Sequence, residues 1–517
     1  MMALMMTAGV NCAPIQAHAQ ENPRADQDDR DVLVVTGRKR EERLQDVPVS
    51  VAVVRGDDLR EGNIKDLEAL SAQIPTFQYA ESVSGNDQVF VRGVGSGVNF
   101  GFENTVGQIF DGFFMGRARF GRASFMDVEQ IEILKGPQGA VIGKNTSAGA
   151  INTRWAKPTD EFEAYIVPTW EFEGDEGYSI QGAVSGPLSD RMRARAAFRW
   201  DDKEGYFENV TINDTVMQVE SPSVRATLEY DLSEDLLATV VYQFNKQERI
   251  GRAFDTANCP LASQPAYAAF GEDCVLDYVN TGSIVQNGES RPQTTNTTSH
   301  FAGLTLDWQT SLGTVSSLTG FTRFETDDFT GGSIGGMEGN VSNFMETYQQ
   351  VTEELRLVSN DGGKFDYIVG GYFQYVTNHD LDWNLDFNAQ GAAPFSFVPP
   401  PARLRSNRIA EQESKTFAVF GELTWYLAPT IDATAGIRFT HEEKDLVKQQ
   451  FQTELFTETP TAPAPFGPPA VVNVHDVTDS LSENQWTPAG SIRWRPSDSA
   501  MLYASISTGF KGGGFDF

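Results

Sequence analysis

The chain has 517 residues, enough for two domains or for one large domain with an insert. Its formal net charge is −31 and its pI is about 4.5, which excludes nucleic acid as an expected partner. No apolar run approaches the ~18 residues of a membrane-spanning helix, but alternating membrane strands never form such a run. The 35 Phe, 14 Tyr and 8 Trp residues are typical of aromatic girdles that face lipid.

The first 46 residues predict an exported, partly disordered segment. Residues 1–19 are rich in Met and Ala and end in Ala-His-Ala, the pattern of a signal-peptide cleavage site, although no Lys or Arg occurs before Arg24. Residues 20–46 are largely charged and predict disorder. Within them lies one isolated β-branched run, Asp31-Val32-Leu33-Val34-Val35-Thr36. This run predicts either the first strand of the next domain or an extended peptide that adds as a strand to a partner's sheet.

Residues 47–157 predict a compact α/β domain. Residues 47–54 have the pattern of a strand, and residues 56–73 that of one helix with four apolar side chains inward. The following stretch, 88–153, contains short apolar runs separated by many glycines, which predicts short strands joined by tight turns. The helix positions expected to face inward are Leu59, Ile64, Leu67 and Leu70.

Residues 161–517 predict about 13 antiparallel membrane strands. In one segment Phe417, Val419, Leu423 and Trp425 share a face, and Ala418, Glu422 and Thr424 share the other, as expected for lipid outside and a polar lumen inside. Short and long connections alternate, which is typical of outer-membrane barrels. We expect an open-sided sheet whose edges lie near residues 161–172 and 501–510.

Four sequence blocks carry a family resemblance. In chain order they are Val-Arg-Gly-Val-Gly (91–95), Phe-Asp-Gly-Phe (110–113), Val-Glu-Gln-Ile-Glu-Ile-Leu-Lys-Gly-Pro-Gln-Gly (128–139) and Gly-Lys-Asn-Thr-Ser-Ala-Gly-Ala-Ile-Asn (143–152). Together they resemble the plug domain of TonB-dependent outer-membrane receptors. The resemblance implies a plug inside a β-barrel, and because such barrels close at about 22 strands, it implies a C-terminally truncated member.

The resemblance also implies partners and a location. It identifies the Asp31–Thr36 run as the TonB box, with TonB and its inner-membrane energising complex as partners. It places the protein in the outer membrane of a Gram-negative bacterium, in contact with outer-membrane lipid. The implied function is energised import of a scarce large solute, most often a ferric siderophore. Cobalamin, haem and oligosaccharides are alternative solutes, and a passive surface barrel for adhesion or for colicin or phage docking is the alternative class.

Two sets of plug residues are candidates for contacts with solute and barrel. The solute candidates combine aromatic and charged side chains: Asn99, Phe100, Phe102, Glu103, Arg117, Arg119, Phe120 and Arg122. The alternative for the arginines is pairing with acidic residues of the barrel wall. For the plug–barrel latch, the resemblance implies that Glu354 faces Arg92 and Lys135; the alternative is that Glu354 bonds an arginine of a neighbouring strand.

The remaining signals concern cysteines and catalysis. Cys259 and Cys274 bracket a loop-like stretch and predict a disulfide in an oxidising compartment, with two free thiols as the alternative. The five histidines are isolated, and His441 lacks the second histidine of a zinc helix. We therefore expect neither enzymatic activity nor a cofactor or metal site.

Overall fold

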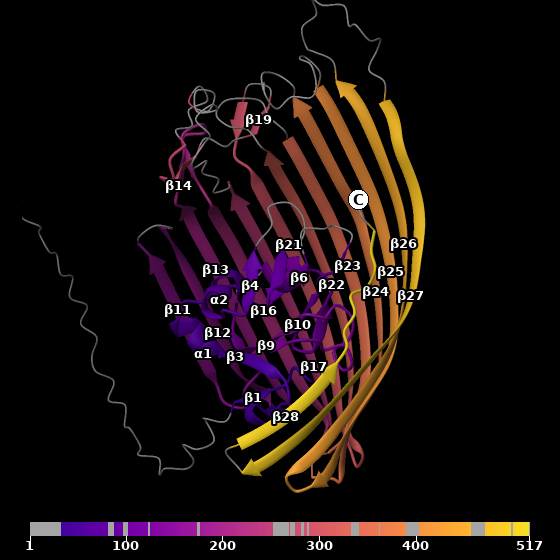
Figure 1. Cartoon of the computed structure of the whole chain (residues 1–517). Helices are drawn as coiled ribbons and strands as arrows, with labels where there is room; N and C mark the ends of the chain where they lie inside the picture. Colours follow the sequence, from indigo (N-terminus) through magenta and orange to yellow (C-terminus); the bar gives the residue numbers. More distant parts are fainter. Residues whose placement is uncertain are drawn as a thin grey trace, which may run out of the picture.

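The computed structural model describes residues 33–80, 87–96, 102–122, 125–172, 176–251, 268, 274–280, 284–286, 289–331, 341–360, 362–388, 403–455, 471–497 and 500–515. A curved antiparallel sheet of 13 strands wraps around a small α/β domain built from the N-terminal part of the chain (Figure 1). We refer to this inner domain as the plug and to the sheet as the wall.

The wall strands follow one another in chain order, and each pairs with the next. They are β11 (Glu163–Glu171), β12 (Glu176–Ser189), β13 (Met192–Gly205), β16 (Gln218–Ser233), β17 (Leu236–Ile250), β21 (Thr294–Thr310), β22 (Gly313–Gly331), β23 (Val341–Val358), β24 (Phe365–Asn388), β25 (Arg403–Ala428), β26 (Ile431–Leu455), β27 (Val471–Ser497) and β28 (Ala500–Ser507). Among the described strands β11 and β28 are the two edges, so the predicted strand number and open side are confirmed.

Several strands are longer than the sequence pattern predicts. Strands β24 and β25 continue to pair through Leu385 and Ser406, inside residues 380–411, where the sequence pattern predicts one of the long connections. Between β13 and β16 a short hairpin forms, β14 (Phe207–Asn209) with β15 (Asp214–Val216), and β18 (Val279–Asn280) joins it. Strands β19 (Ile284–Gln286) and β20 (Glu289–Arg291) form a separate pair.

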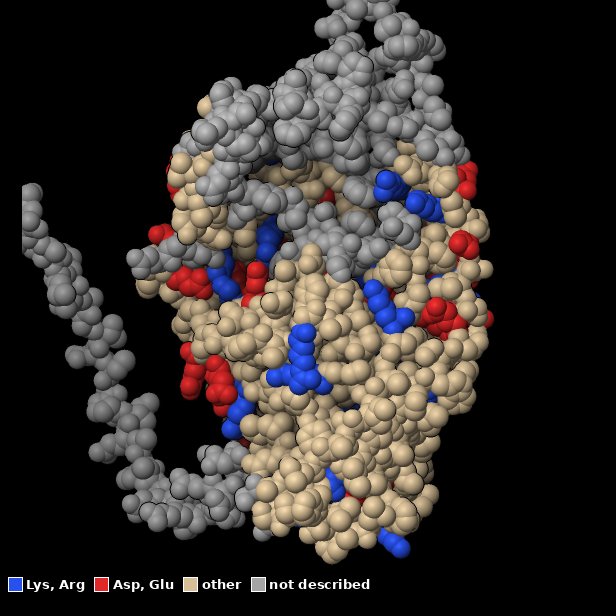
Figure 2. All heavy atoms as spheres, in the orientation of Figure 1, with Lys and Arg blue, Asp and Glu red and all other residues tan. Residues whose placement is uncertain are grey.

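The two faces of the wall follow the predicted alternation. On β25, Phe417 and Val419 are 50% and 62% exposed on the outer face, whereas Ala418 and Thr424 are buried toward the plug. Rings of Trp170, Tyr178 and Trp200 contact one another along the outside of β11, β12 and β13. Seen from its open side, the lower half of the molecule is covered mostly by uncharged residues (Figure 2).

The plug contains two sheets and two short helices. The larger sheet has the order β3 (Ser50–Arg55), β9 (Val128–Lys135), β10 (Gly149–Trp155), β7 (Val106–Phe110) and β8 (Phe113–Met115), with β10 and β7 parallel. The smaller sheet has the order β4 (Phe77–Ala80), β5 (Gln88–Val91) and β6 (Val94–Ser96). Helices α1 (Gly56–Glu61) and α2 (Leu67–Gln73) pack between them around a core that includes Leu70, Phe77, Ile131 and Ile133.

The single helix predicted for residues 56–73 is two helices. The chain leaves α1 through Asn63, which adopts a left-handed φ of 49°, and α2 begins anew where the Asp66 carboxylate accepts a hydrogen bond from the Ala69 N–H at 2.7 Å. This N-cap supplies one of the acceptors that a new helix needs. No helix in the described part of the chain is both long and apolar enough to cross a membrane.

The structure describes only one of the two cysteines of the predicted disulfide. Cys274 is disulfide-bonded, and Cys259 lies outside the described residues. The pairing of the two therefore stays a prediction.

Candidate functional site

The β-branched run before the plug forms a hairpin. Of the predicted coupling residues, Asp31 and Val32 lie outside the described residues, and Leu33 to Thr36 lie inside them. Strand β1 (Val34–Val35) pairs antiparallel with β2 (Glu42–Arg43), followed by the 3-10 turn η1 (Leu44–Asp46). The ordered hairpin differs from the disorder predicted for residues 20–46. Three of its charged residues, Arg38, Lys39 and Arg40, pair with carboxylates of the wall.

One buried carboxylate holds this hairpin against the plug. Glu132, on β9 between β3 and β10, is fully buried and accepts hydrogen bonds from the N–H groups of Thr36 at 2.9 Å and Gly37 at 2.7 Å. The Gln130 side chain donates to the Val34 carbonyl at 2.9 Å. A Cβ at Gly37 would lie 2.5 Å from Leu134 Cδ1, so any other residue there would require the Leu134 side chain to move.

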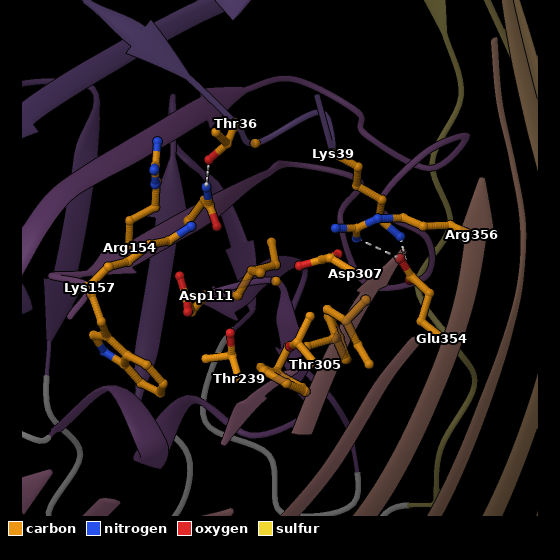
Figure 3. A pocket seen from close by; sticks show the side chains of 18 of the residues that line it. Thr36, Lys39, Asp111, Arg154, Lys157, Thr239, Thr305, Asp307, Glu354 and Arg356 are labelled. Atoms are coloured by element: carbon orange, nitrogen blue, oxygen red, sulfur yellow. Dashed lines mark hydrogen bonds and ion pairs between the residues drawn. The ribbon is translucent and has the colours of Figure 1, made fainter. Parts of the chain in front are cut away.

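The hairpin turn carries three consecutive cations, Arg38, Lys39 and Arg40, which we call the basic triplet. Arg38 pairs with Glu422 on β25 at 2.6 Å, and Arg40 pairs with Asp366 on β24 at 2.9 Å. Lys39 donates to Glu354 on β23, as Figure 3 shows. Three adjacent wall strands therefore each contribute one carboxylate to the hairpin turn.

The predicted latch partners of Glu354 are wrong. Glu354 is buried and faces the plug side, but its described partners are Lys39 and Arg356, the latter on its own strand at 3.0 Å. Among the described residues no ion pair joins it to Arg92 or Lys135, which line a separate cavity with Arg38 and Glu422. The hairpin inserts its own cation where a plug cation was expected.

Burial disfavours the charged form of Lys39. Desolvation lowers its pKa to about 8, and the attraction of Glu354 offsets only part of that cost. The Lys39 ammonium group also lies 4.5 Å from the centroid of the Phe420 ring. Docking the hairpin thus places a lysine in a site that favours its charged form less than water does.

The plug body is attached to the opposite part of the wall with the charges reversed. Asp127, just before β9, accepts two hydrogen bonds of 2.6 Å from Arg195 on β13. Arg225 on β16 lies 3.6 Å from the same carboxylate and donates to the carbonyls of Met126 and Asp127. The plug supplies one carboxylate here, and the wall supplies two arginines.

A third attachment links the plug loop after β9 to β26. Lys144 pairs with Glu442 at 2.5 Å and with Glu103 at 3.0 Å, and Lys444 lies 3.5 Å from Glu442. Burial would raise the pKa of Glu103, but Lys144 and Lys444 outweigh it and hold this pKa at about 2. The pKa of Lys144 is raised, because Glu103 and Glu442 together overcome the opposing effect of its burial.

The predicted solute residues are mostly buried between plug and wall. Arg117 pairs with Glu346 at 3.4 Å and Arg119 with Asp328 at 2.6 Å, so the alternative of pairing with acidic wall residues describes their geometry. Phe120 packs on Phe301 in an apolar cluster. Phe102 lies 5.1 Å below the Lys511 ammonium group. Asn99, Phe100 and the Arg122 side chain lie outside what the structure describes.

A cavity of about 250 Å³ separates the plug from the wall beside the hairpin. Figure 3 shows Lys39 and Arg356 converging on Glu354 at one end, and Asp111, Arg154 and Lys157 at the other. Thr239 on β17 and Thr305 on β21 line the cavity on the side of the wall. The described residues contain no group of three or more His, Cys, Asp or Glu side chains placed to hold a metal ion.

Sequence reasoning missed three of these elements: Glu132, the basic triplet as a wall contact, and Asp127. The signal for Glu132 was present, since a charged residue stands between Ile131 and Ile133 in a strand paired on both sides. Such a residue is expected to be buried with hydrogen-bond donors around it.

Known families match both domains. Residues 43–150 match the TonB-dependent Receptor Plug Domain, and residues 254–517 match the family described as TonB dependent receptor-like, beta-barrel. The pesticin receptor of Yersinia pestis is 23% identical over 505 residues, which cover 96% of this chain and 66% of that protein. The vitamin B12 transporter BtuB of Photobacterium profundum is 24% identical over 204 residues, covering 38% of this chain and 31% of that protein.

Solved structures agree on the fold. The ferric yersiniabactin uptake receptor FyuA of Yersinia pestis superposes with a TM-score of 0.68 at 16% identity, over 89% of this chain and 64% of that one. The siderophore receptor PiuA of Acinetobacter baumannii gives a TM-score of 0.65 at 16% identity, over 90% of this chain and 65% of that one. The chain thus spans about two thirds of the length of these relatives.

Proposed function

Because this chain belongs to the TonB-dependent receptor family, we propose that it is an energised outer-membrane receptor that imports a scarce large solute. The observation that carries the proposal is the hairpin of residues 33–46 docked on Glu132. A passive barrel has no use for a separate β-prone segment that is held to the plug by hydrogen bonds. An energised receptor needs such a segment, because its energising partner has to bind it and pull on it.

The hairpin is linked directly to the plug sheet. The Thr36 and Gly37 amides bond the carboxylate of Glu132, and β9 pairs with β3 on one side and β10 on the other. Tension on the chain at Val34 therefore reaches the plug sheet through these bonds and through the chain that continues from Asp46 into β3. The partner we propose is TonB with its inner-membrane energising complex, which would take β1 by strand addition.

The solute class that we favour is a ferric siderophore. Of the proteins similar to this chain, PiuA is a siderophore receptor and FyuA a ferric yersiniabactin uptake receptor, whereas BtuB is a vitamin B12 transporter. Cobalamin, haem or an oligosaccharide are the alternatives. Residues 1–19 would direct export, residues 47–157 would form the plug, and the apolar outer face of residues 161–517 would contact lipid in the outer membrane of a Gram-negative bacterium.

The test separates solute binding from solute import. Replacing Val34 with Pro removes the N–H that strand addition requires, and Val34→Ala is the matched control that keeps it. Cells lacking their own siderophore receptors would express each variant and be offered ⁵⁵Fe-loaded siderophores from a chemically diverse panel. We expect Val34→Pro to bind iron complex at the cell surface but to lose uptake. Equal loss of both activities would show that the segment is structural.

A further inference from the structure

A row of four lumen-facing side chains crosses the wall where Lys39 docks. Glu354 on β23 stands opposite Tyr372 on β24, and Phe420 on β25 stands opposite Arg438 on β26. Glu354, Phe420 and Arg438 are each buried between wall and plug. The row therefore ends in an anion on one side and in a cation on the other, with two aromatic rings between them.

Arg438 has no acidic partner among the described residues. Its guanidinium is buried on the rings of Tyr372 and Phe420, 5.4 and 5.2 Å from their centroids. Its Nε donates to Thr440 Oγ1 at 3.2 Å, and its Nη1 has no hydrogen-bond partner in the described structure. The plug loop presses on it at Gly143, where a Cβ would lie 2.9 Å from Arg438 Cζ. A buried guanidinium with an idle donor is costly, which suggests that another state uses it.

Lys39 occupies the position that Arg438 could use. Its ammonium group lies on the same Phe420 ring and binds Oε2 of Glu354, while Arg356 binds Oε1. Each carboxylate oxygen therefore already binds one cation. Arg438 is near enough for its charge to act on Glu354 and on Lys39, but no hydrogen bond joins it to either. Two cations thus share one ring and compete for one carboxylate.

We propose that Glu354 is passed from Lys39 to Arg438 when the hairpin leaves the wall. The inference rests on the proposed function, because it takes the hairpin as the segment that TonB withdraws. Departure of Lys39 frees Oε2 and empties the space over Phe420. Rotation of the long Arg438 side chain into that space then brings its idle Nη1 to the freed oxygen. Arg438 is in this sense a positioning residue, which lowers the cost of release by giving Glu354 a second cation beside Arg356.

The experiment measures how often the hairpin undocks. A Val35→Cys reporter is buried in the docked hairpin, and a Glu41→Cys reporter is exposed, so their ratio corrects for reagent reactivity. The full chain, purified in detergent, is treated with a maleimide and labelling at the reporter is followed by peptide mass spectrometry. When redocking is faster than labelling, the rate reports the undocked population. We expect Arg438→Met to slow labelling about tenfold, since the released state then leaves Glu354 without its second cation.

Two further variants distinguish the transfer of Glu354 from simple repulsion between Arg438 and Lys39 and from a packing role of Arg438. In a Glu354→Gln background the slowing by Arg438→Met should vanish, because there is no carboxylate to pass on. If the slowing persists there, Arg438 acts only by repelling Lys39, and the proposal is wrong. Arg438→Lys should restore fast labelling, whereas a purely packing role predicts that it behaves like Met. If Arg438→Met does not fold, as judged by circular dichroism, Arg438→Gln makes the same comparison.

The outcome is independent of the test of function. Labelling involves neither TonB nor a solute, so an unchanged rate in Arg438→Met overturns the transfer of Glu354 and leaves the import proposal intact. Conversely, normal uptake by Val34→Pro would show that the hairpin is not the segment through which import is energised, and would leave the labelling result standing as a property of the hairpin.

Discussion

The plug body and the hairpin that precedes it are both held to the wall by ion pairs, but the ion pairs of the two attachments differ in burial and in number of bonds. At the plug body, two wall arginines converge on Asp127, whose side chain is 1% exposed and which receives a two-bond contact from Arg195. At the hairpin, three cations are spread over three carboxylates, and the basic side chains are 11–15% exposed. The pairs of the plug body are the more deeply buried, and Lys39 forms a single-point contact where Arg195 forms two bonds.

The apolar contacts differ in the same direction. The plug has a core that includes Leu70, Phe77, Ile131 and Ile133, whereas the hairpin buries little more than Val35. The hairpin is therefore attached mainly by polar bonds that can be replaced by water. Pulling on the chain should therefore detach the hairpin before it disturbs the plug.

The largest effect is expected at the plug body. Asp127→Asn keeps the side-chain volume but removes the ion-pair partner of the buried Arg225 and leaves Arg195 with only the exposed Glu163, at 3.7 Å. Removing one partner of a buried pair costs about 3–5 kcal/mol of unfolding free energy. Asp160→Asn, which affects an exposed pair with Arg193, is the matched control and should cost at most ~1 kcal/mol. Denaturant unfolding of the detergent-solubilised protein measures both, and equal costs would remove the distinction drawn for the plug body.

An intermediate effect is expected where the hairpin meets the plug. Glu132→Gln replaces a carboxylate oxygen with an NH₂ group that faces the Thr36 or Gly37 N–H. Hydrogen bonds to charged groups contribute about 1.5–3 kcal/mol, so maleimide labelling of a Val35→Cys reporter should rise at least ~tenfold. Glu129→Gln on the same strand, whose side chain is 43% exposed, should leave labelling unchanged. If Glu132→Gln lowered the unfolding free energy as much as Asp127→Asn, hairpin and plug would not be separable.

The smallest effect is a pH dependence of hairpin docking. The pKa of Lys39 is about 8 when docked, against an ordinary value of 10.5, because docking desolvates its charge. Docking therefore releases a proton between these values, and raising the pH through this window favours the docked hairpin. Between about pH 7.5 and 9.5 we expect corrected Val35→Cys labelling to slow about twentyfold. Lys39→Met should abolish this dependence, and faster labelling at high pH would contradict the assignment.

Much of the fold followed from the sequence. Alternation such as Phe417, Val419, Leu423 and Trp425 opposite Ala418 and Thr424 predicted both faces of the wall, because a strand's side chains alternate by geometry alone. The glycine-rich blocks predicted the plug. The division of residues 56–73 into two helices was missed, since the apolar spacing continues across Asn63 and only the cap at Asp66 marks the new start.

What the sequence determined by itself is therefore the periodic and local part: strand faces, the presence of a plug, and a β-prone run at residues 31–36. Only the tertiary structure decided which charges meet. Glu354 was expected to face Arg92 and Lys135, and it faces Lys39 instead, 315 positions away in the chain. The physical reason is that an ion pair depends on a distance of a few ångströms between groups with no fixed sequence separation, and a chain with 71 acidic and 40 basic residues offers many pairings. Packing of the hairpin, plug and wall selects among them.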